Sequence, residues 1–470
     1  MVPTCSFAQN AKTKKTISYD PKASCTIITG DELTDKALAT AIWTIDHNTT
    51  EDSLLKAGAD YGGEWTRDIA INSWNAVSLL RPGLAEHSLW SVTEERKTIG
   101  HQYWDKIIWT IAAWNHYLIT GNESFLAQAY DCCKRTMQTL EDTCFDHSYG
   151  LFMGPAVYQD GITAYEEPVF DTTLKFNGFV LAHPNSHTIK CLSTNAVYFY
   201  SYLCLAEMAK LREPAAVKGY LQKAQALKRQ FRKHFLNKKE GKLYFLIDHT
   251  GHKHDFQEGL GVAFAIKFGL VSESEALAIL KNIHSTPSGI PATWPCLKRC
   301  SAEQPGRHNV MIWPHVNMFF ADACASAGRY DLFRFEVSNL AQLAVTHDPN
   351  GEVNFHEIYT PDGIPSGGWQ CGSLWPPLNH QTWCATGFLR NYLYHILGLA
   401  PTPEGLYLYP LGASTGKVSA TNLPYRDALL NITVYGVGTQ IAECTINGEK
   451  SRPFIPANAT GTIEVVIRMK

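Results

Sequence analysis

The sequence lacks an excess of charge of either sign. Its 470 residues include 41 Lys and Arg against 44 Asp and Glu, which gives a formal net charge of −3. A surface for nucleic acid needs a concentration of basic residues, so this balance argues against nucleic acid as a partner. No apolar run approaches the ~18 residues that a membrane-spanning helix requires, so no membrane span is expected either.

Several motifs of common enzyme chemistry are also missing. The 13 cysteines form no CxxC pair and no metal-finger spacing, and there is no Gly-x-Ser-x-Gly elbow or phosphate-cradling glycine loop. His252 and His254 are close together, but a lysine-rich turn is more typical of solvated histidines. Most cysteines are expected to be buried thiols, although Cys296 and Cys300 lie near enough in a loop to pair. We therefore expect no metal and no cofactor.

The first residues, MVPTCSFAQNAKTKK, are similar to the end of a cleaved secretory signal, because small residues are followed by a polar lysine run. The charged and apolar regions of a complete signal are absent, and a disordered tail explains the same residues equally well. Residues 1–30 are thus expected to form an N-terminal tail. A periplasmic or secreted location is favoured, and a cytoplasmic one stays open.

Helical periodicity dominates residues 31–400, where apolar and aromatic residues recur at helical spacing between Gly, Pro and Asn-rich gaps. No repeat of 34 or 40 residues is present, so a closed α/α toroid is favoured over a helical solenoid. The fold expected is a mainly α, (α/α)6 toroid. Its clearest helices are predicted at 34–47, 68–80, 103–120, 124–140, 193–210, 215–235, 259–268, 273–283, 312–327, 330–345 and 378–397.

The pattern changes after Pro401. Segments such as ALLNITVYGVG and TIEVVIR alternate in polarity, are rich in β-branched residues and are separated by Gly, Asn and Pro turns. Residues 401–470 are therefore predicted to form a small antiparallel, sandwich-like β domain.

Three long loops, 150–192, 284–309 and 350–377, are expected to carry function, since loops of this length are rarely mere connectors. They and the helix entrance GGEWTRDIAINSW combine carboxylates, aromatic residues and glycine. Arg67 and Asp68 in that entrance could cap and neutralise a helix, or could bind a polyhydroxylated ligand beside Trp65. Two carboxylates on facing loops are what cleavage of a glycosidic bond requires.

These motifs resemble those of the six-hairpin, (α/α)6-barrel glycosidases, and most closely the inverting clan that contains trehalases and processing α-glucosidase I enzymes. Trp65-Thr66-Arg67-Asp68 is similar to the element of that clan that grips the non-reducing sugar. Glu357, followed by Pro361-Asp362-Gly363 and Trp369, resembles its general-base loop. Ser193-Thr194-Asn195-Ala196 opens a helix after Asp160, as an asparagine-bearing helix follows the acid of the clan.

One motif departs from the clan. The general acid of the clan usually lies in a Glu-Ser-Gly-x-Asp motif, whereas here Asp160 ends the segment GPAVYQD. Glu166 and Glu167 therefore remain alternative candidates for the acid.

The resemblance implies an exo-acting, inverting glycoside hydrolase that removes an α-linked glucoside or related sugar from oligosaccharides or glycoconjugates, as a monomer or homodimer. Asp160 would be the general acid and Glu357 the general base. A disaccharide phosphorylase on the same barrel and a non-catalytic carbohydrate-binding protein are the alternatives. The residues expected to bind the sugar are Trp65, Arg67, Asp68, Trp104, Asp105, Glu167, Arg307, His308, Trp313, Trp369 and Gln370.

Overall fold

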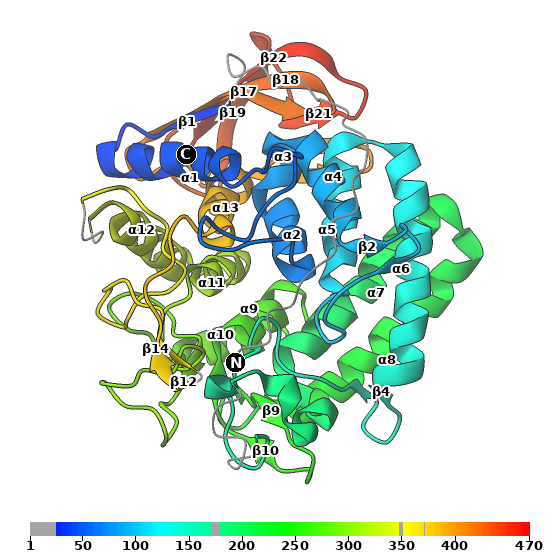
Figure 1. Cartoon of the computed structure of the whole chain (residues 1–470). Coiled ribbons are helices and arrows are strands. Elements are labelled where there is room, and N and C mark those ends of the chain that lie inside the picture. The colour runs from blue at the N-terminus through cyan, green and yellow to red at the C-terminus, as the bar shows by residue number, and fades with distance from the viewer. Residues whose placement is uncertain (1–24, 171–177, 347–350, 371) are drawn as a thin grey trace.

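The computed structural model describes residues 25–170, 178–346, 351–370 and 372–470. Helices form most of the chain up to residue 398, and strands form most of the remainder (Figure 1). No helix in these ranges is long and apolar enough to cross a membrane. All cysteines in the same ranges are free thiols, and all except Cys296 are buried, so Cys296 and Cys300 are not paired.

In the described part of the chain, six inner helices contact one another in a closed ring, each touching the next and the last touching the first. Their sequences explain why they lie inside. The helix IWTIAAWNHYLIT, for example, is apolar nearly all round and has every residue but its last one buried. In order round the ring they are α2 (Thr66–Asn72), α5 (Ile108–Thr120), α7 (Leu192–Arg212), α9 (Gly259–Lys267), α11 (Pro314–Ser326) and α13 (Thr382–Asn391).

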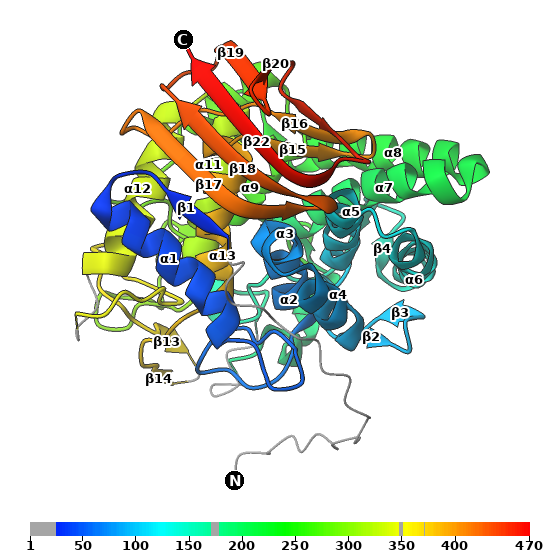
Figure 2. The ribbon, with the colours of Figure 1, turned by 90° about the horizontal axis from the view of Figure 1, so that it is seen from above.

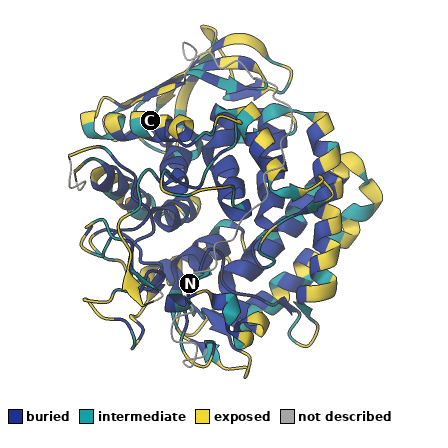
Figure 3. Cartoon of the chain, viewed as in Figure 1, coloured by how far each residue is buried: buried dark blue, intermediate teal, exposed yellow. Residues whose placement is uncertain are grey.

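Among the described residues, six outer helices alternate with the inner ones and cover the ring. Their exposed residues gather on the side that faces away from the ring, as Figure 3 shows for α6 and α8. This one-sided burial follows from amphipathic sequences such as VKGYLQKAQALKRQFRKHF. The outer helices are α1 (Glu32–His47), α4 (Pro82–Ser91), α6 (Glu123–Cys144), α8 (Val217–Phe235), α10 (Glu273–Lys281) and α12 (Tyr330–Thr346).

The predicted helices are all present, but α4 was not predicted. Its Pro82-Gly83 start indicates a turn, whereas proline at the first position of a helix is favourable because no amide hydrogen bond is lost there. Helix α5 begins at Ile108, five residues after the predicted start. Two inner helices continue through π-helical turns, η2 (Ser73–Val77), which leads into α3 (Ser78–Leu80), and η7 (Tyr392–Ile396).

The C-terminal strands form two sheets against the C-terminal ends of inner helices, with β17 contacting α3 and β15 contacting α5. The larger sheet has the order β1-β17-β18-β22-β19-β20, and β15, β16 and β21 form the smaller one (Figure 2). The bounds are β15 (Leu399–Thr402), β16 (Gly405–Leu408), β17 (Lys417–Tyr425), β18 (Asp427–Tyr435), β19 (Ile441–Ile446), β20 (Glu449–Lys450), β21 (Phe454–Pro456) and β22 (Thr460–Met469).

Two features of the larger sheet differ from the sequence-based expectation. Strands β18 and β22 pair in parallel, so a wholly antiparallel domain is wrong at this pair. The long connection through β19, β20 and β21 permits it, since a parallel pair needs a crossover. Strand β1 (Thr26–Ile28), from the segment expected to be a tail, pairs with β17 through Thr26 and Thr421.

The inner helices all start at the end of the ring opposite the C-terminal sheets, and the loops that enter them carry short strands and turns (Figure 1). The ends of these loops converge where the helices begin. The short elements of these loops are β2 (Thr93–Glu94), β3 (Thr98–Ile99), β4 (Phe145–Asp146), β5 (Leu151–Phe152), η3 (Ile162–Ala164), η4 (Val180–Ala182), η5 (Pro184–Thr188), β6 (Lys190–Cys191), β7 (Leu236–Asn237), β8 (Lys242–Leu243), β9 (Leu246–Ile247), β10 (Lys253–His254), β11 (Gln257–Glu258), β12 (Thr293–Trp294), β13 (Trp369–Gln370) and β14 (Ser373–Leu374). The short helix η6 (Pro214–Ala216) instead connects α7 to α8.

Candidate active site

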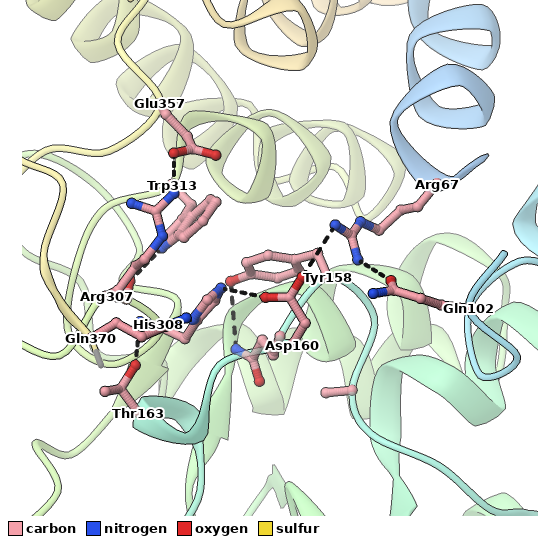
Figure 4. Close-up of polar contacts among 12 residues, drawn as sticks. Arg67, Gln102, Tyr158, Asp160, Thr163, Arg307, His308, Trp313, Glu357 and Gln370 are labelled. Carbon is pink, nitrogen blue, oxygen red and sulfur yellow. Dashed lines mark hydrogen bonds and ion pairs between the residues drawn. The ribbon is translucent and has the colours of Figure 1, made fainter. Parts of the chain in front are cut away.

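A cavity of about 210 Å³ lies where the inner helices begin. Its walls combine indole and phenyl rings with two guanidinium groups and three carboxyl groups, drawn from five separate loops and helix starts. Figure 4 shows the polar contacts among some of these residues. The lining residues are Ala57, Tyr61, Trp65, Arg67, Asp68, Gln102, Tyr158, Asp160, Phe179, Arg307, His308, Trp313, Glu357, Gln370, Trp375 and Trp383.

Arg67, in the first turn of α2, joins one wall of the cavity to three acids. Its Nη1 lies 3.1 Å from Asp105 Oδ2, its Nε lies 3.6 Å from Asp68 Oδ2, and its Nη2 lies 3.7 Å from Asp160 Oδ2. Gln102 accepts a further hydrogen bond from Nη1 at 3.2 Å. One buried cation therefore fixes the positions of three carboxylates relative to one another.

Asp68 does not cap its helix. The N-cap residue of α2 is Trp65, no side chain makes a capping hydrogen bond, and Asp68 lines the cavity instead. Burial raises the pKa of Asp68 to about 7, and the Glu357 and Asp160 charges add to this rise while Arg67 opposes it. Within the described residues, its carboxyl group has the Arg67 ion pair and no hydrogen-bond donor. A carboxyl group that titrates near neutrality thus faces the cavity.

Asp160 lies on the loop that precedes α7, between a cation and an imidazole. Its Oδ1 lies 3.5 Å from Nε2 of His308, and its side chain is 26% exposed. Burial lowers the pKa of His308 to about 3, against the opposing effect of Asp160, so this imidazole is neutral at pH 7. His308 stacks on Trp313 with ring centroids 5.0 Å apart, and its Nδ1 lies 3.1 Å from Gln370 Oε1.

The backbone of the Asp160 loop is strained and closely packed. Tyr158 has a φ of 59°, a left-handed conformation that costs a non-glycine residue roughly 1–2 kcal/mol. Gly161 follows Asp160, and a Cβ there would collide with the side chains of Gln370 and His308. Strain of this kind persists only where the surroundings hold it in place, and it is concentrated at functional sites.

The start of α7 supplies that support. Ser193 Oγ accepts a hydrogen bond from Val157 N at 2.9 Å, and Asn195 Oδ1 accepts one from Phe152 N at 2.8 Å. Asn195 Nδ2 returns a hydrogen bond to Phe152 O at 3.0 Å, and Thr194 donates to Pro155 O. The Ser-Thr-Asn motif singled out in the sequence therefore ties down the loop that positions Asp160.

Glu357 lies on the loop that precedes α13 and is 3% exposed. The Tyr61 hydroxyl lies 2.9 Å from Oε1 and 3.1 Å from Oε2, and the Arg307 guanidinium forms an ion pair with Oε2. Arg307 also donates to Tyr61 Oη at 3.0 Å and to Gly367 O at 2.6 Å, and its guanidinium lies 5.1 Å from the ring centre of Trp313. The carboxylate is thus held in one orientation at the cavity wall.

The structure brings nine of the predicted site residues to the cavity wall and places four elsewhere. Trp104 is fully buried behind the Asp160 loop, with its indole N–H donating to Ala156 O at 3.1 Å. Asp105 lies behind Arg67, and Trp369 accepts a backbone hydrogen bond from Arg307 N. The remaining residue, Glu167, is exposed. The nine at the wall are Trp65, Arg67, Asp68, Asp160, Arg307, His308, Trp313, Glu357 and Gln370.

The substitutes considered for the acid also lie apart from the cavity lining. Glu166 Oε2 lies 3.3 Å from His254 Nδ1, and His254 Nε2 lies 3.0 Å from Asp248 Oδ2. Glu166 therefore belongs to a Glu166–His254–Asp248 network of polar contacts that is separate from the cavity lining.

Sequence reasoning missed several lining residues. Tyr158 and Trp375 belong to loops that combine carboxylates with aromatic residues, and this composition is the sequence signal that points to them. Tyr61 precedes the helix entrance, and Trp383 lies in α13, where an indole fits a helical core equally well. The others are Ala57, Gln102 and Phe179.

The ring of helical hairpins is the fold of the six-hairpin glycosidases, and the chain has this fold. Residues 87–286 match the family model described as the bacterial alpha-L-rhamnosidase 6 hairpin glycosidase domain. No curated protein matches the sequence.

Solved structures of this class are similar in fold. A sialidase superimposes with a TM-score of 0.69 at 13% identity, over 95% of this chain and 43% of its own. A rhamnosidase of Bacillus sp. GL1 gives 0.58 at 13% identity, over 95% of this chain and 44% of its own. A mannosylglycerate hydrolase of Thermus thermophilus, in complex with glucose, gives 0.56 at 12% identity, over 75% and 99%. The chain thus spans less than half the length of the sialidase and of the rhamnosidase.

Proposed function

We propose that the protein is an exo-acting, inverting glycoside hydrolase that releases a terminal α-linked sugar. The observation that carries the proposal is the meeting of Asp68, Asp160 and Glu357 at one small cavity. Its volume of about 210 Å³ is below the roughly 300–1,000 Å³ of pockets for drug-sized ligands, which favours a single sugar ring. Trp65, Trp313 and Trp383 contribute apolar indole surface to the cavity wall.

Glu357 is proposed as the general base. An inverting enzyme needs a carboxylate that activates water on the face of the sugar opposite the leaving group. Arg307 and Tyr61 fix the orientation of this carboxylate, and Arg307 compensates its charge. A separation of roughly 6.5–9.5 Å between the two catalytic carboxyl groups is expected in a substrate complex, because the water must fit between base and sugar.

Asp160 is proposed as the general acid. Its greater exposure than that of Asp68 supports this role, because the leaving group of an exo-acting enzyme departs toward the open side of the cavity. Asp68 is then a ligand for sugar hydroxyls, together with Arg67. One observation favours the reverse assignment, since the pKa of Asp68 at about 7 suits a group that keeps a proton near neutral pH.

The two assignments can be separated by the leaving group. Fluoride leaves a glycosyl fluoride without being protonated. The alcohol of an alkyl glycoside leaves only when an acid donates a proton to the glycosidic oxygen. If Asp160 is the acid, Asp160→Asn should lose most activity on the alkyl glycoside and keep much of it on the fluoride, while Asp68→Asn should lose activity on both. The opposite pattern would give the acid role to Asp68.

Two observations bear on the identity of the sugar. The rhamnosidase domain model favours an α-L-rhamnoside, while the sequence motifs favour an α-glucoside. We propose an α-linked monosaccharide at the non-reducing end, to be identified with p-nitrophenyl α-L-rhamnoside, α-D-glucoside and α-D-mannoside in parallel.

The alternatives have weaker support. A phosphorylase needs cations available for phosphate, but Arg67 and Arg307 are both committed to carboxylates and the pKa of His308 at about 3 keeps it neutral. A sugar-binding protein without catalysis would need one cavity carboxylate or none, whereas three line this cavity.

The decisive experiment is proton NMR of the first product released, with and without phosphate. Inversion at the anomeric carbon in the absence of phosphate is expected. Retention of configuration would overturn the mechanism, and turnover only with phosphate would establish the phosphorylase.

A further inference from the structure

A second cavity, of about 230 Å³, lies beside the β11–β12 ribbon at the end of α10. None of its lining residues lines the first cavity. We propose that it is a second carbohydrate-binding site, which takes one pyranose ring and performs no chemistry. It is lined by Lys242, Leu243, Asp255, Phe256, Gln257, Val262, Ile279, Asn282, Ile283, His284, Trp294 and Pro295.

Trp294 provides a fixed aromatic surface. It is 36% exposed, although most tryptophans of this protein are buried. One face stacks on His284, with ring centroids 3.6 Å apart and planes 10° apart. Gln257 holds the His284 backbone from both sides, accepting from its N at 2.8 Å and donating to its O at 3.0 Å. An indole fixed in this way loses little freedom when a ligand stacks on it.

Polar groups lie beside this surface. Asp255 is half exposed and forms an ion pair with Lys242. Asn282 uses its Nδ2 to donate to Glu240 O at 2.9 Å and Gly241 O at 3.2 Å, and within the described residues its Oδ1 has no partner. Leu243, Val262 and Ile279 are buried beneath.

This combination suits a sugar better than a wholly apolar ligand. A pyranose has an apolar face of C–H groups and an edge of hydroxyl groups. The Trp294 face matches the first, and the Asp255 and Asn282 oxygens accept hydrogen bonds from the second. The neutral state of His284, whose pKa is lowered by burial, keeps a positive charge away from the stacked pair at pH 7.

The ribbon that carries Trp294 also reaches the active site. Thr293, the preceding residue, is buried, accepts a hydrogen bond from Gln159 Nε2 at 3.1 Å and donates to His308 O at 3.2 Å. Successive residues of a strand point to opposite sides, so Thr293 faces the active-site loops and Trp294 faces the second cavity. If the proposed function holds, this site would retain a longer glycan next to the catalytic cavity.

The binding itself can be tested without any turnover. The protein is labelled with 5-fluorotryptophan, and the ¹⁹F signal of Trp294 is assigned from its loss in Trp294→Phe. The signal is then followed during titration with methyl α-L-rhamnopyranoside, methyl α-D-glucopyranoside, methyl α-D-mannopyranoside and maltotriose. At least one should shift it along a saturating curve that differs from the curve of Trp65 or Trp375. The shift should persist in Glu357→Gln and weaken in Asp255→Ala.

Trp43 offers a matched control in the same spectrum. It is 46% exposed and stacks on His47 at 4.3 Å and 18°, but it does not line either cavity. Its signal should not move. A Trp294 signal that no glycoside shifts, or that moves only in parallel with Trp43, would overturn the second site.

A kinetic experiment separates the second site from the proposed function. Trp294→Ala should raise KM for a long oligosaccharide several-fold and leave kcat and KM for a p-nitrophenyl monosaccharide unchanged. An enzyme without glycosidase activity would refute the proposed function but leave the ¹⁹F result standing. Equal KM values for the long substrate in both proteins would limit the site to binding of free sugar.

Discussion

Each end of the helical ring has a buried cluster of charged side chains, and the two clusters have opposite ratios of acids to bases. At the C-terminal ends of the inner helices, one buried acid, Asp322 on α11, contacts three basic residues: Lys267 at 2.8 Å, Arg390 at 2.7 Å and His395 at 2.7 Å. At the N-terminal ends, one buried cation, Arg67, contacts three acids.

This difference sets the protonation of the acids. Burial alone would raise the pKa of Asp322, but Lys267, Arg390 and His395 outweigh it and hold the pKa well below its usual range. Burial dominates at Asp68, whose single cation is shared with two other acids, and its pKa rises to about 7. Where cations outnumber the acid, Asp322 stays ionised and its ion pairs connect the helices. Where acids outnumber the cation, Asp68 exchanges a proton near neutral pH.

The largest effect on activity is expected for Glu357→Gln at the N-terminal end. This change keeps the shape but removes the base, so turnover of the best p-nitrophenyl glycoside should fall by roughly 10²–10⁴-fold. The midpoint of thermal unfolding should fall, because the buried Arg307 guanidinium loses its ion-pair partner, so turnover is compared well below that midpoint. A variant with full activity would remove Glu357 from the mechanism.

The largest effect on stability is expected at the other end, for Asp322→Ala. Three basic groups would be left without their buried partner, and the free energy of unfolding should fall by about 3–5 kcal/mol, measured by urea denaturation. The control is Asp331→Ala, which removes an exposed acid paired with Arg329 and should cost at most about 1 kcal/mol. Equal losses in the two variants would contradict the proposed role of the Asp322 cluster.

Glu258, a buried acid without a cationic partner among the described residues, should make the stability of the protein depend on pH. It is fully buried just before α9, and burial raises its pKa to about 8, against the hydrogen bond from Ser193 N. Between pH 4.5 and pH 8 the folded protein keeps a proton that the unfolded chain has lost, so this residue lowers stability as pH rises through that window.

Glu258→Gln should therefore be more stable than the wild type at pH 9, by roughly 2–5 kcal/mol at about 1.4 kcal/mol per pKa unit, and nearly equal to it at pH 5. Urea denaturation at the two pH values measures this. A stability difference that does not change with pH would show that Glu258 does not bind a proton on folding.

The smallest effect concerns Asp68 as a sugar ligand. Its carboxylate form becomes dominant above pH 7, so binding of the product monosaccharide to the wild type should tighten, by less than about tenfold, as pH rises through 7. Titration calorimetry at pH 6 and pH 8 measures it, and Asp68→Asn should abolish the dependence. An unchanged dependence in that variant would assign it to another group.

The sequence predicted the helices well because their pattern is local, whereas the parallel pairing of β18 and β22 depends on segments about 30 residues apart. Loops that combine carboxylates with aromatic residues led to Arg67, Asp160 and Glu357.

The same composition could not tell which members of a loop face the cavity. Trp104 and Asp105 have the residue types of a sugar site but lie behind the wall, where they support Ala156 and Arg67. That distinction depends on the direction of each side chain, which only the folded backbone sets.

The short strand β1 gives the chain an order of assembly. Thr26 and its partner Thr421 are 395 residues apart. At a synthesis rate of about 5–20 residues per second, β1 would wait roughly 20–80 s for β17 to be made. During that time the helical ring can form, whereas most strands of its β cover have yet to be synthesised. The first described strand therefore finds its place in the sheet only after the helices of the ring have been made.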